Sequence, residues 1–130
     1  MTHVLLVDDE PQLLRTLVLS LTQRGFAVST AADATSALRL VKDEPPDLVV
    51  LDLGLPDLDG LEVVRRIHRA EPMLPIIVLS ARSGSGDKIV ALDLGAVDYV
   101  TKPFDVNELL ARLRAAVRRR GPLPPREAVT

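Results

Sequence analysis

The chain has 130 residues, of which 47% are hydrophobic, 26% charged and 2% aromatic. This length and composition are typical of one globular domain with an aliphatic core, and they exclude an intrinsically disordered chain. A formal net charge of -2 gives the domain as a whole no electrostatic reason to bind nucleic acid. Because the chain has no cysteine, disulfide bonds and thiolate metal sites are also excluded.

No apolar run reaches the roughly 18 residues of a membrane span, and the amino terminus lacks a signal-peptide pattern. The sequence therefore predicts a cytoplasmic protein that does not associate with a membrane.

Five short apolar runs predict five β-strands, and apolar residues at helical spacing predict a helix after each of them. The strands are expected at residues 3–7, 26–30, 48–52, 75–80 and 97–101. Asp33 and Asp105 are suited to cap the second and the last helix. A soft loop at 83–87 should lead into a short fourth helix from about Lys88 to Leu94. Since strands and helices alternate, the strands should be parallel, with right-handed crossovers, in an α/β fold.

We expect one domain over residues 1–120. The proline-rich stretch that begins with Gly121 and Pro122 cannot continue a helix, so residues 121–130 are predicted to start a linker.

The run 48–52 predicts a strand buried on both faces, with Asp52 at its carboxyl end, where open α/β sheets place their ligands. Taken alone, an acidic group in this position is more often a solvated loop residue. Polar residues also follow the other buried runs, namely Asp8-Asp9, Ser80 and Lys102. In a parallel sheet these strand ends share one edge, which weakens the interpretation of the acids as loop and capping residues.

Carboxylates gathered at one edge repel one another unless a cation lies between them. A hard, oxygen-liganded Mg²⁺ ion is the natural partner, with Asp8, Asp9 and Asp52 as ligands. Asp52 could then act as a nucleophile toward a phosphoryl group. The metal and Lys102 would neutralise the transferring oxygens, and the Ser80 hydroxyl would donate a hydrogen bond to them.

These motifs, together with Pro103-Phe104 after Lys102, resemble the receiver domain of two-component response regulators over residues 3–119. The resemblance implies a flavodoxin-like, doubly wound five-stranded parallel sheet in the order 2-1-3-4-5 with five helices. It implies that a histidine kinase phosphorylates Asp52, and that Mg²⁺ is bound by Asp9, Asp52 and the Gly54 carbonyl, with Asp8 close by or bound through water. It also implies a cis peptide bond before Pro103, and no enzyme activity beyond the domain's own phosphotransfer and dephosphorylation.

The resemblance further implies a conformational switch through Ser80 and Tyr99. Residues 96–104 are similar to the OmpR/PhoB-type transcription factors, and Gly54 within 52–57 is similar to the Kdp-type potassium-transport regulators. Gly54 departs from the larger side chains common at this position of the family, which bears on the lifetime of the acyl phosphate.

In that subfamily a helix–strand–helix face forms a symmetric homodimer on phosphorylation, and DNA is bound by a separate carboxyl-terminal domain. We expect a truncated transcription factor or a stand-alone receiver, and the linker favours truncation. Solvated surface is the simpler interpretation of the charged residues on this face. The candidate interface residues are Lys88, Ile89, Leu92, Asp98, Glu108, Ala111, Arg112 and Arg119.

Two alternatives remain open. A haloacid-dehalogenase-type phosphatase also uses an aspartate after a strand, but it expects a second aspartate where Gly54 stands. A flavodoxin-like cofactor carrier needs a phosphate loop after the first strand, where Asp8-Asp9-Glu10 would repel a phosphate. Elsewhere, His68 is interpreted as a surface residue, and Arg118-Arg119-Arg120 as cations favoured at a helix carboxyl end rather than a nucleic-acid patch.

Overall fold

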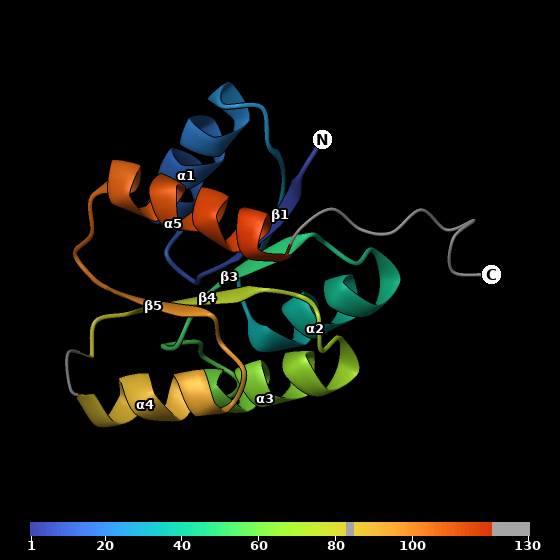
Figure 1. Ribbon diagram of the computed structural model, residues 1–130, viewed down its shortest axis with the longest axis vertical. Coiled ribbons are helices and arrows are strands. Elements are labelled where there is room, and N and C mark those ends of the chain that lie inside the picture. Colours follow the sequence, from blue (N-terminus) through green and yellow to red (C-terminus); the bar gives the residue numbers. More distant parts are fainter. Residues whose placement is uncertain (83–84, 121–130) are drawn as a thin grey trace.

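The computed structural model describes residues 1–82 and 85–120, which form a five-stranded sheet with helices on both faces (Figure 1). The strands are β1 (His3–Val7), β2 (Ala27–Ala31), β3 (Leu48–Asp52), β4 (Ile76–Ser80) and β5 (Asp98–Thr101). The helices are α1 (Pro11–Gln23), α2 (Ala34–Asp43), α3 (Gly60–Ala70), α4 (Ser85–Asp93) and α5 (Val106–Arg120). The predicted linker 121–130 lies outside the described residues.

The sheet has the order β2-β1-β3-β4-β5, and every neighbouring pair of strands is parallel. Both the predicted class and the strand order are therefore confirmed. Helices α1 and α5 cover one face, while α2, α3 and α4 cover the other (Figure 1). All residues of β3 and β4 are buried, because both faces of these strands are covered.

The core consists of two apolar layers, one on each face of the sheet. Alternate residues of a strand point to opposite faces, so Val4 and Leu6 pack on the α1 and α5 side while Leu5 and Val7 pack on the other. No helix within the described residues is long and apolar enough to cross the lipid bilayer.

Two sequence-based predictions need correction. Helix α4 begins at Ser85 rather than near Lys88, so part of the predicted loop 83–87 is helical. Asp87 lies in its first turn, where the helix dipole favours a negative charge. His68 is half-buried rather than a simple surface residue. Its ring packs against Gly95, where a Cβ atom would lie only 2.4 Å from His68 Cγ.

Candidate functional site

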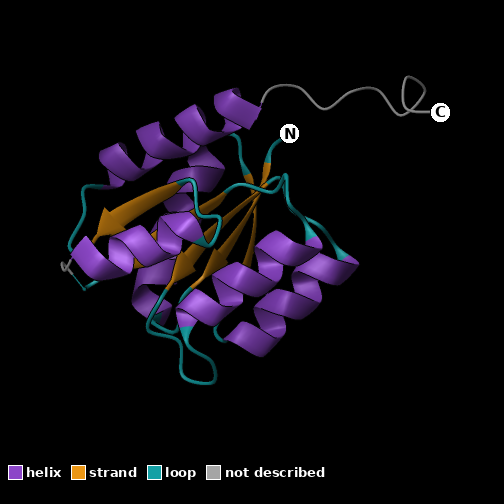
Figure 2. Cartoon of the chain, turned by 60° about the horizontal axis from the view of Figure 1, so that its bottom comes forward, coloured by secondary structure: helices purple, strands orange, loops and turns teal. Residues whose placement is uncertain are grey.

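The polar residues singled out in the sequence meet at the carboxyl edge of the sheet. Asp8 directly follows β1, Asp52 ends β3, Ser80 ends β4 and Lys102 directly follows β5. The arrows of the strands point toward this edge (Figure 2). Since the four strands are neighbours in one parallel sheet, these residues come together although up to 94 positions separate them in the chain.

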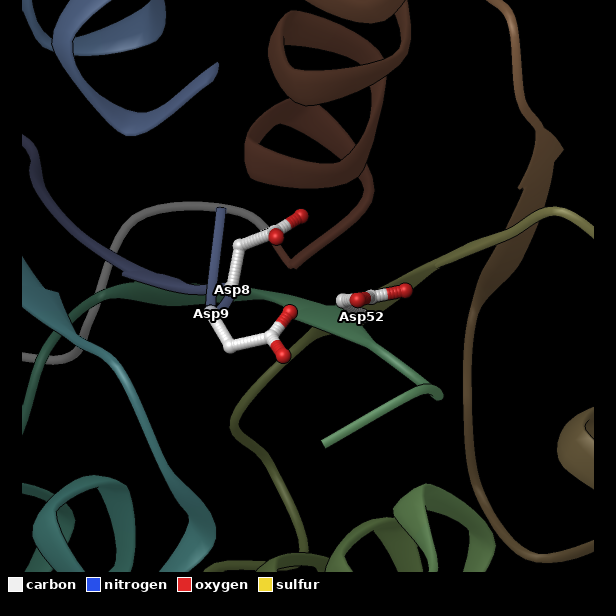
Figure 3. A group of neighbouring side chains, drawn as sticks. All are labelled: Asp8, Asp9 and Asp52. Atoms are coloured by element: carbon white, nitrogen blue, oxygen red, sulfur yellow. The ribbon is translucent and has the colours of Figure 1, made fainter. Parts of the chain in front are cut away.

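Asp8, Asp9 and Asp52 form an acidic triad. Each contributes a carboxylate oxygen, and these oxygens lie within 4.8 Å of one another. Figure 3 shows Asp8 and Asp9 extending from the end of β1 beside Asp52 on β3. Asp8 and Asp52 are only 2% and 7% exposed, whereas Asp9 is exposed to solvent. Clustered hard oxygen ligands with one open, solvated side fit Mg²⁺, which keeps several of its waters.

Lys102 is the cation that the structure places against this triad. Its Nζ donates a hydrogen bond of 2.9 Å to Asp8 Oδ2 and lies 3.5 Å from Asp52 Oδ1. Burial disfavours the charged ammonium, but the hydrogen bond to Asp8 and the negative charge of Asp52 outweigh it. The pKa of Lys102 is therefore raised, and the group stays charged. One ammonium faces three carboxylates, so the site keeps an excess of negative charge.

The excess of negative charge affects the pKa of the Asp52 carboxyl group. Burial raises its pKa and the charge of Asp8 raises it further, whereas Lys102 and the backbone N–H of Gly54 partly oppose the shift. A Cβ atom on Gly54 would lie 3.6 Å from Asp52 Oδ2, so the backbone of this residue runs close beside the carboxylate. A bound cation would relieve the repulsion that the single ammonium leaves.

Ser80 and Tyr99 are connected through the backbone of Arg82, a residue that sequence analysis did not identify. The Arg82 N–H donates to Ser80 Oγ at 2.9 Å, and the Tyr99 hydroxyl donates to the Arg82 carbonyl at 2.9 Å. Tyr99 is only 7% exposed, so its ring already lies inside the protein in this structure. No pattern in the sequence could identify Arg82, because it joins Ser80 to Tyr99 through backbone atoms, which every residue has.

The loop between β3 and α3 forms the wall beside the triad. Together with Arg82, it lines an open cleft of about 480 Å³. Its residue Asp57, which sequence analysis also missed, accepts hydrogen bonds from the first turn of α2. A local capping signal could not have revealed this contact, since the helix begins 23 residues before the loop residue that caps it.

The candidate interface residues lie on α4, β5 and α5. Ile89 and Leu92 are 57% and 39% exposed, and Lys88, Glu108 and Ala111 are exposed as well. Within the chain, Arg112 already pairs with Asp98 at 2.9 Å and with Glu108 at 3.0 Å. Arg119 lies two turns further along α5, where it lines a separate hollow of about 270 Å³ beside His68 and Met73.

A parallel doubly wound sheet with an acidic triad, a hydroxyl and an ammonium on its carboxyl edge is the arrangement of a receiver-type signalling domain, in which the triad fits a phosphorylation site. The chain belongs to the response regulator receiver domain family, whose model matches residues 4–114. The cis peptide bond predicted between Lys102 and Pro103 is present in the structure. The match removes the support for the phosphatase and cofactor-carrier alternatives.

Solved receiver structures have the same fold. The chain resembles a CheY-like receiver domain protein from Methanospirillum hungatei, with a TM-score of 0.89 and 26% identity over 92% of this chain and 96% of that one. It also resembles the non-phosphorylated HemR receiver domain from Leptospira biflexa, with a TM-score of 0.86 and 34% identity over 96% of this chain and 98% of that one.

Among curated proteins, the chain is 58% identical to the transcriptional regulatory protein KdpE of Mycobacterium tuberculosis, over 92% of this chain and 52% of that protein. It is 46% identical to the response regulator ArlR of Staphylococcus aureus, over 92% of this chain and 54% of that protein. The resemblance to Kdp-type regulators is therefore confirmed. The chain spans about half the length of the curated relatives it matches.

Proposed function

We propose that this receiver domain accepts a phosphoryl group on Asp52 from a histidine kinase and thereby controls an attached transcription-regulatory domain. The observation that carries the proposal is the buried Asp52 carboxylate at the carboxyl end of the central strand, 3.5 Å from Lys102 Nζ and within 4.8 Å of carboxylate oxygens of Asp8 and the exposed Asp9. The relatives' names supply the transcriptional context, and DNA binding would belong to a domain beyond the residues described.

In the phosphotransfer step, an Asp52 oxygen attacks the phosphorus of a phosphohistidine. A P–O bond forms while the P–N bond breaks, and the imidazole nitrogen keeps the electron pair and takes up a proton. Lys102 lies within reach of both Asp8 and Asp52 and balances charge on the transferred group. Mg²⁺ held by Asp9, Asp52 and the Gly54 carbonyl, with Asp8 nearby or bound through water, would supply charge neutralisation at the phosphoryl oxygens.

The same site reverses the modification. Attack of water on phosphorus breaks the P–O bond to Asp52 and releases inorganic phosphate and the free carboxylate. Gly54 places no side chain over Asp52, so water can approach the phosphoryl group from the open cleft. This arrangement favours a short-lived acyl phosphate, and the activity stays confined to the domain's own phosphotransfer and dephosphorylation.

The switch runs from Ser80 through Arg82 to Tyr99. When the Ser80 hydroxyl turns to donate to a phosphoryl oxygen, it leaves the Arg82 N–H that it accepts from in this structure. The Arg82 carbonyl, which holds the Tyr99 hydroxyl, is part of the same residue. Rearrangement of this residue would change the position of Tyr99 on β5 and reshape the adjoining face.

That face is the proposed homodimer interface. Ile89, Leu92 and Ala111 supply apolar contact, while Asp98 and Arg112 set the register through charge. Phosphorylation shifts a pre-existing equilibrium toward the dimer, since it stabilises one of two arrangements of the face.

The decisive experiment is phosphorylation by acetyl phosphate with Mg²⁺, followed by mapping of the adduct by mass spectrometry. Wild type should gain one phosphoryl group on Asp52, and the gain should disappear without Mg²⁺ or in Asp52→Asn. An adduct that persists at full yield in Asp52→Asn would refute the assignment.

A further inference from the structure

Asp57 makes a contact between two segments that are not neighbours in the chain. Its carboxylate accepts hydrogen bonds from the Ala34 N–H at 2.8 Å, the Thr35 N–H at 3.0 Å and the Thr35 hydroxyl at 2.8 Å. Of the first three N–H groups of α2, the N-cap residue Asp33 satisfies only the third, since its side chain accepts from the Ser36 N–H at 2.7 Å. Asp57 therefore satisfies the other free donors of this helix start from outside.

The loop that carries Asp57 is held at its other end by α3. The Gly60 N–H donates to the Leu53 carbonyl at 3.2 Å, and a Cβ atom on Gly60 would lie 2.4 Å from Leu53 Cα. Only glycine allows this close approach. Residues 53–59 are thus closed into a loop at their base, and Asp57 ties the outer part of that loop to α2. Gly54, beside the Asp52 carboxylate, lies between the two attachments.

The contact also reaches the other half of the acidic triad. The Asp8 N–H donates to the Ala31 carbonyl at 3.1 Å, at the end of β2. Three residues later, Ala34 donates to Asp57. The connection between β2 and α2 therefore joins the Asp8-Asp9 segment on one side to the loop 53–59, which follows Asp52, on the other. These hydrogen bonds link the two groups of carboxylates by a second path, in addition to the direct pairing of β1 with β3.

We propose that Asp57 is a positioning residue for the acidic site: its hydrogen bonds to the first turn of α2 hold the Gly54 backbone beside Asp52. This inference rests on the proposed function for its consequence, because a fixed Gly54 matters for binding Mg²⁺ and for phosphotransfer. The positioning itself can be tested in the metal-free protein. Loss of these hydrogen bonds frees the loop, and the Gly54 backbone then lies beside the Asp52 carboxylate for a smaller fraction of the time.

Asp33→Ala is the matched control for Asp57→Ala. Each substitution removes a carboxylate that accepts from the first turn of α2, but within the described residues the Asp33 carboxylate forms no hydrogen bond to the loop 53–59. Urea unfolding of both variants measures the general loss of stability. Asp57→Asn keeps one oxygen acceptor in the same place, so it should restore part of whatever Asp57→Ala loses.

The first measurement is amide hydrogen exchange at Gly54 by NMR in metal-free buffer. We expect exchange roughly fivefold or more faster in Asp57→Ala than in wild type, since a loosened loop opens more often. In Asp33→Ala the rate should stay within about twofold of wild type. Equal acceleration in the two alanine variants, or none in Asp57→Ala, would overturn the positioning role.

The second measurement is Mg²⁺ affinity by calorimetry, with the rate of phosphorylation by acetyl phosphate. Asp57→Ala should bind Mg²⁺ roughly three- to tenfold more weakly, a smaller loss than for a residue that bonds directly to a ligand. Asp57→Asn should lie between wild type and Asp57→Ala, and Asp33→Ala should match wild type. Unchanged affinity and rate in Asp57→Ala would overturn the inference even if Gly54 exchange were faster. Failure of wild type to bind Mg²⁺ or accept phosphate would instead overturn the proposed function, and the exchange result would still decide the positioning role.

Discussion

Asp52 and Asp57 are two carboxylates five residues apart, and their surroundings shift their pKa values in opposite directions. Burial and the charge of Asp8 raise the pKa of Asp52. Hydrogen bonds from Ala34 and Thr35 lower the pKa of Asp57 to about 2, although its side chain is exposed. The difference shows that burial and a neighbouring negative charge destabilise the Asp52 carboxylate, whereas hydrogen-bond donors stabilise the Asp57 carboxylate. The Asp57 carboxylate accepts three hydrogen bonds, whereas Lys102 and the Gly54 backbone only partly oppose the effect of burial on Asp52.

The largest effect on stability is expected when the cation beside the acidic triad, Lys102, is replaced by a neutral residue. Lys102→Met keeps the length of the side chain but leaves Asp8 and Asp52 facing each other without a positive charge. We expect the free energy of unfolding to fall by roughly 3 kcal/mol in metal-free buffer, as when one partner of a buried ion pair is removed. Added Mg²⁺ should recover part of this loss.

Lys88→Met provides the control, because Lys88 is an exposed lysine on α4. Its substitution should change stability by no more than about 0.5 kcal/mol. Urea unfolding with EDTA and with Mg²⁺ measures both variants. A similar change in the two would show that Lys102 does not compensate the triad.

Much of this site follows from the sequence because it depends on strand ends. Apolar runs fix where β1, β3 and β4 lie, and parallel topology then brings Asp8, Asp52 and Ser80 to one edge whatever the details of packing. Asp57 and Arg82 could not be found in this way. Asp57 caps a helix that is distant in the chain, and Arg82 acts through its backbone, so neither leaves a periodic pattern.

The boundaries of the elements show the same limit. Helix α4 begins three residues before the position that the sequence predicts, because Ser85 and Gly86 are poor helix formers in a helix interior. At the first turn these residues are tolerated, and no local signal separates that position from a loop. His68 was assigned to the surface because nothing in its own helix indicates that Gly95 leaves room for its ring.

A second test compares the pH dependence of Asp52→Asn with that of Asp57→Asn in metal-free buffer. A raised folded-state pKa means that the Asp52 carboxylate becomes unfavourable as pH rises from the unfolded value of 3.8 through the folded value. Asp52→Asn should therefore be more stable than wild type at neutral pH, by about 1 kcal/mol, which is typical of relieving one unfavourable charge. The gain should shrink toward pH 4.

Asp57→Asn should show the opposite sign. Its lowered pKa of about 2 contributes stability above the unfolded value of 3.8, which is lost as pH falls toward 2. The variant should be less stable than wild type at neutral pH, and the two should converge in acid. Urea titrations at several pH values measure both profiles. Shifts of the same sign in the two variants would contradict the comparison.

The smallest effect on stability concerns the exposed charges of the proposed dimer face. Arg112 pairs with Asp98 and Glu108 at a surface that is partly solvated, so Arg112→Glu should lower monomer stability by only about 0.5–1 kcal/mol. Its effect on association should be larger, because each contact occurs twice in a two-fold interface, so the substitution creates two repulsive pairs of like charges. Asp98→Arg should weaken the phosphorylated dimer for the same reason.

Mixing the two variants separates pairing within a chain from pairing between chains. Inside each variant, residues 98 and 112 carry like charges, whereas a heterodimer brings Asp98 of one protomer to Arg112 of the other and Glu to Arg at the second contact. We expect each variant alone to sediment mainly as a monomer with acetyl phosphate and Mg²⁺, and the mixture to dimerise. Arg114→Glu, an exposed substitution of the same charge on α5, should dimerise like wild type. If each variant alone dimerises like phosphorylated wild type, Asp98 and Arg112 pair only within the chain, and the dimer uses another surface. If the variants and their mixture all stay monomeric, Asp98 and Arg112 do not pair with each other across the interface.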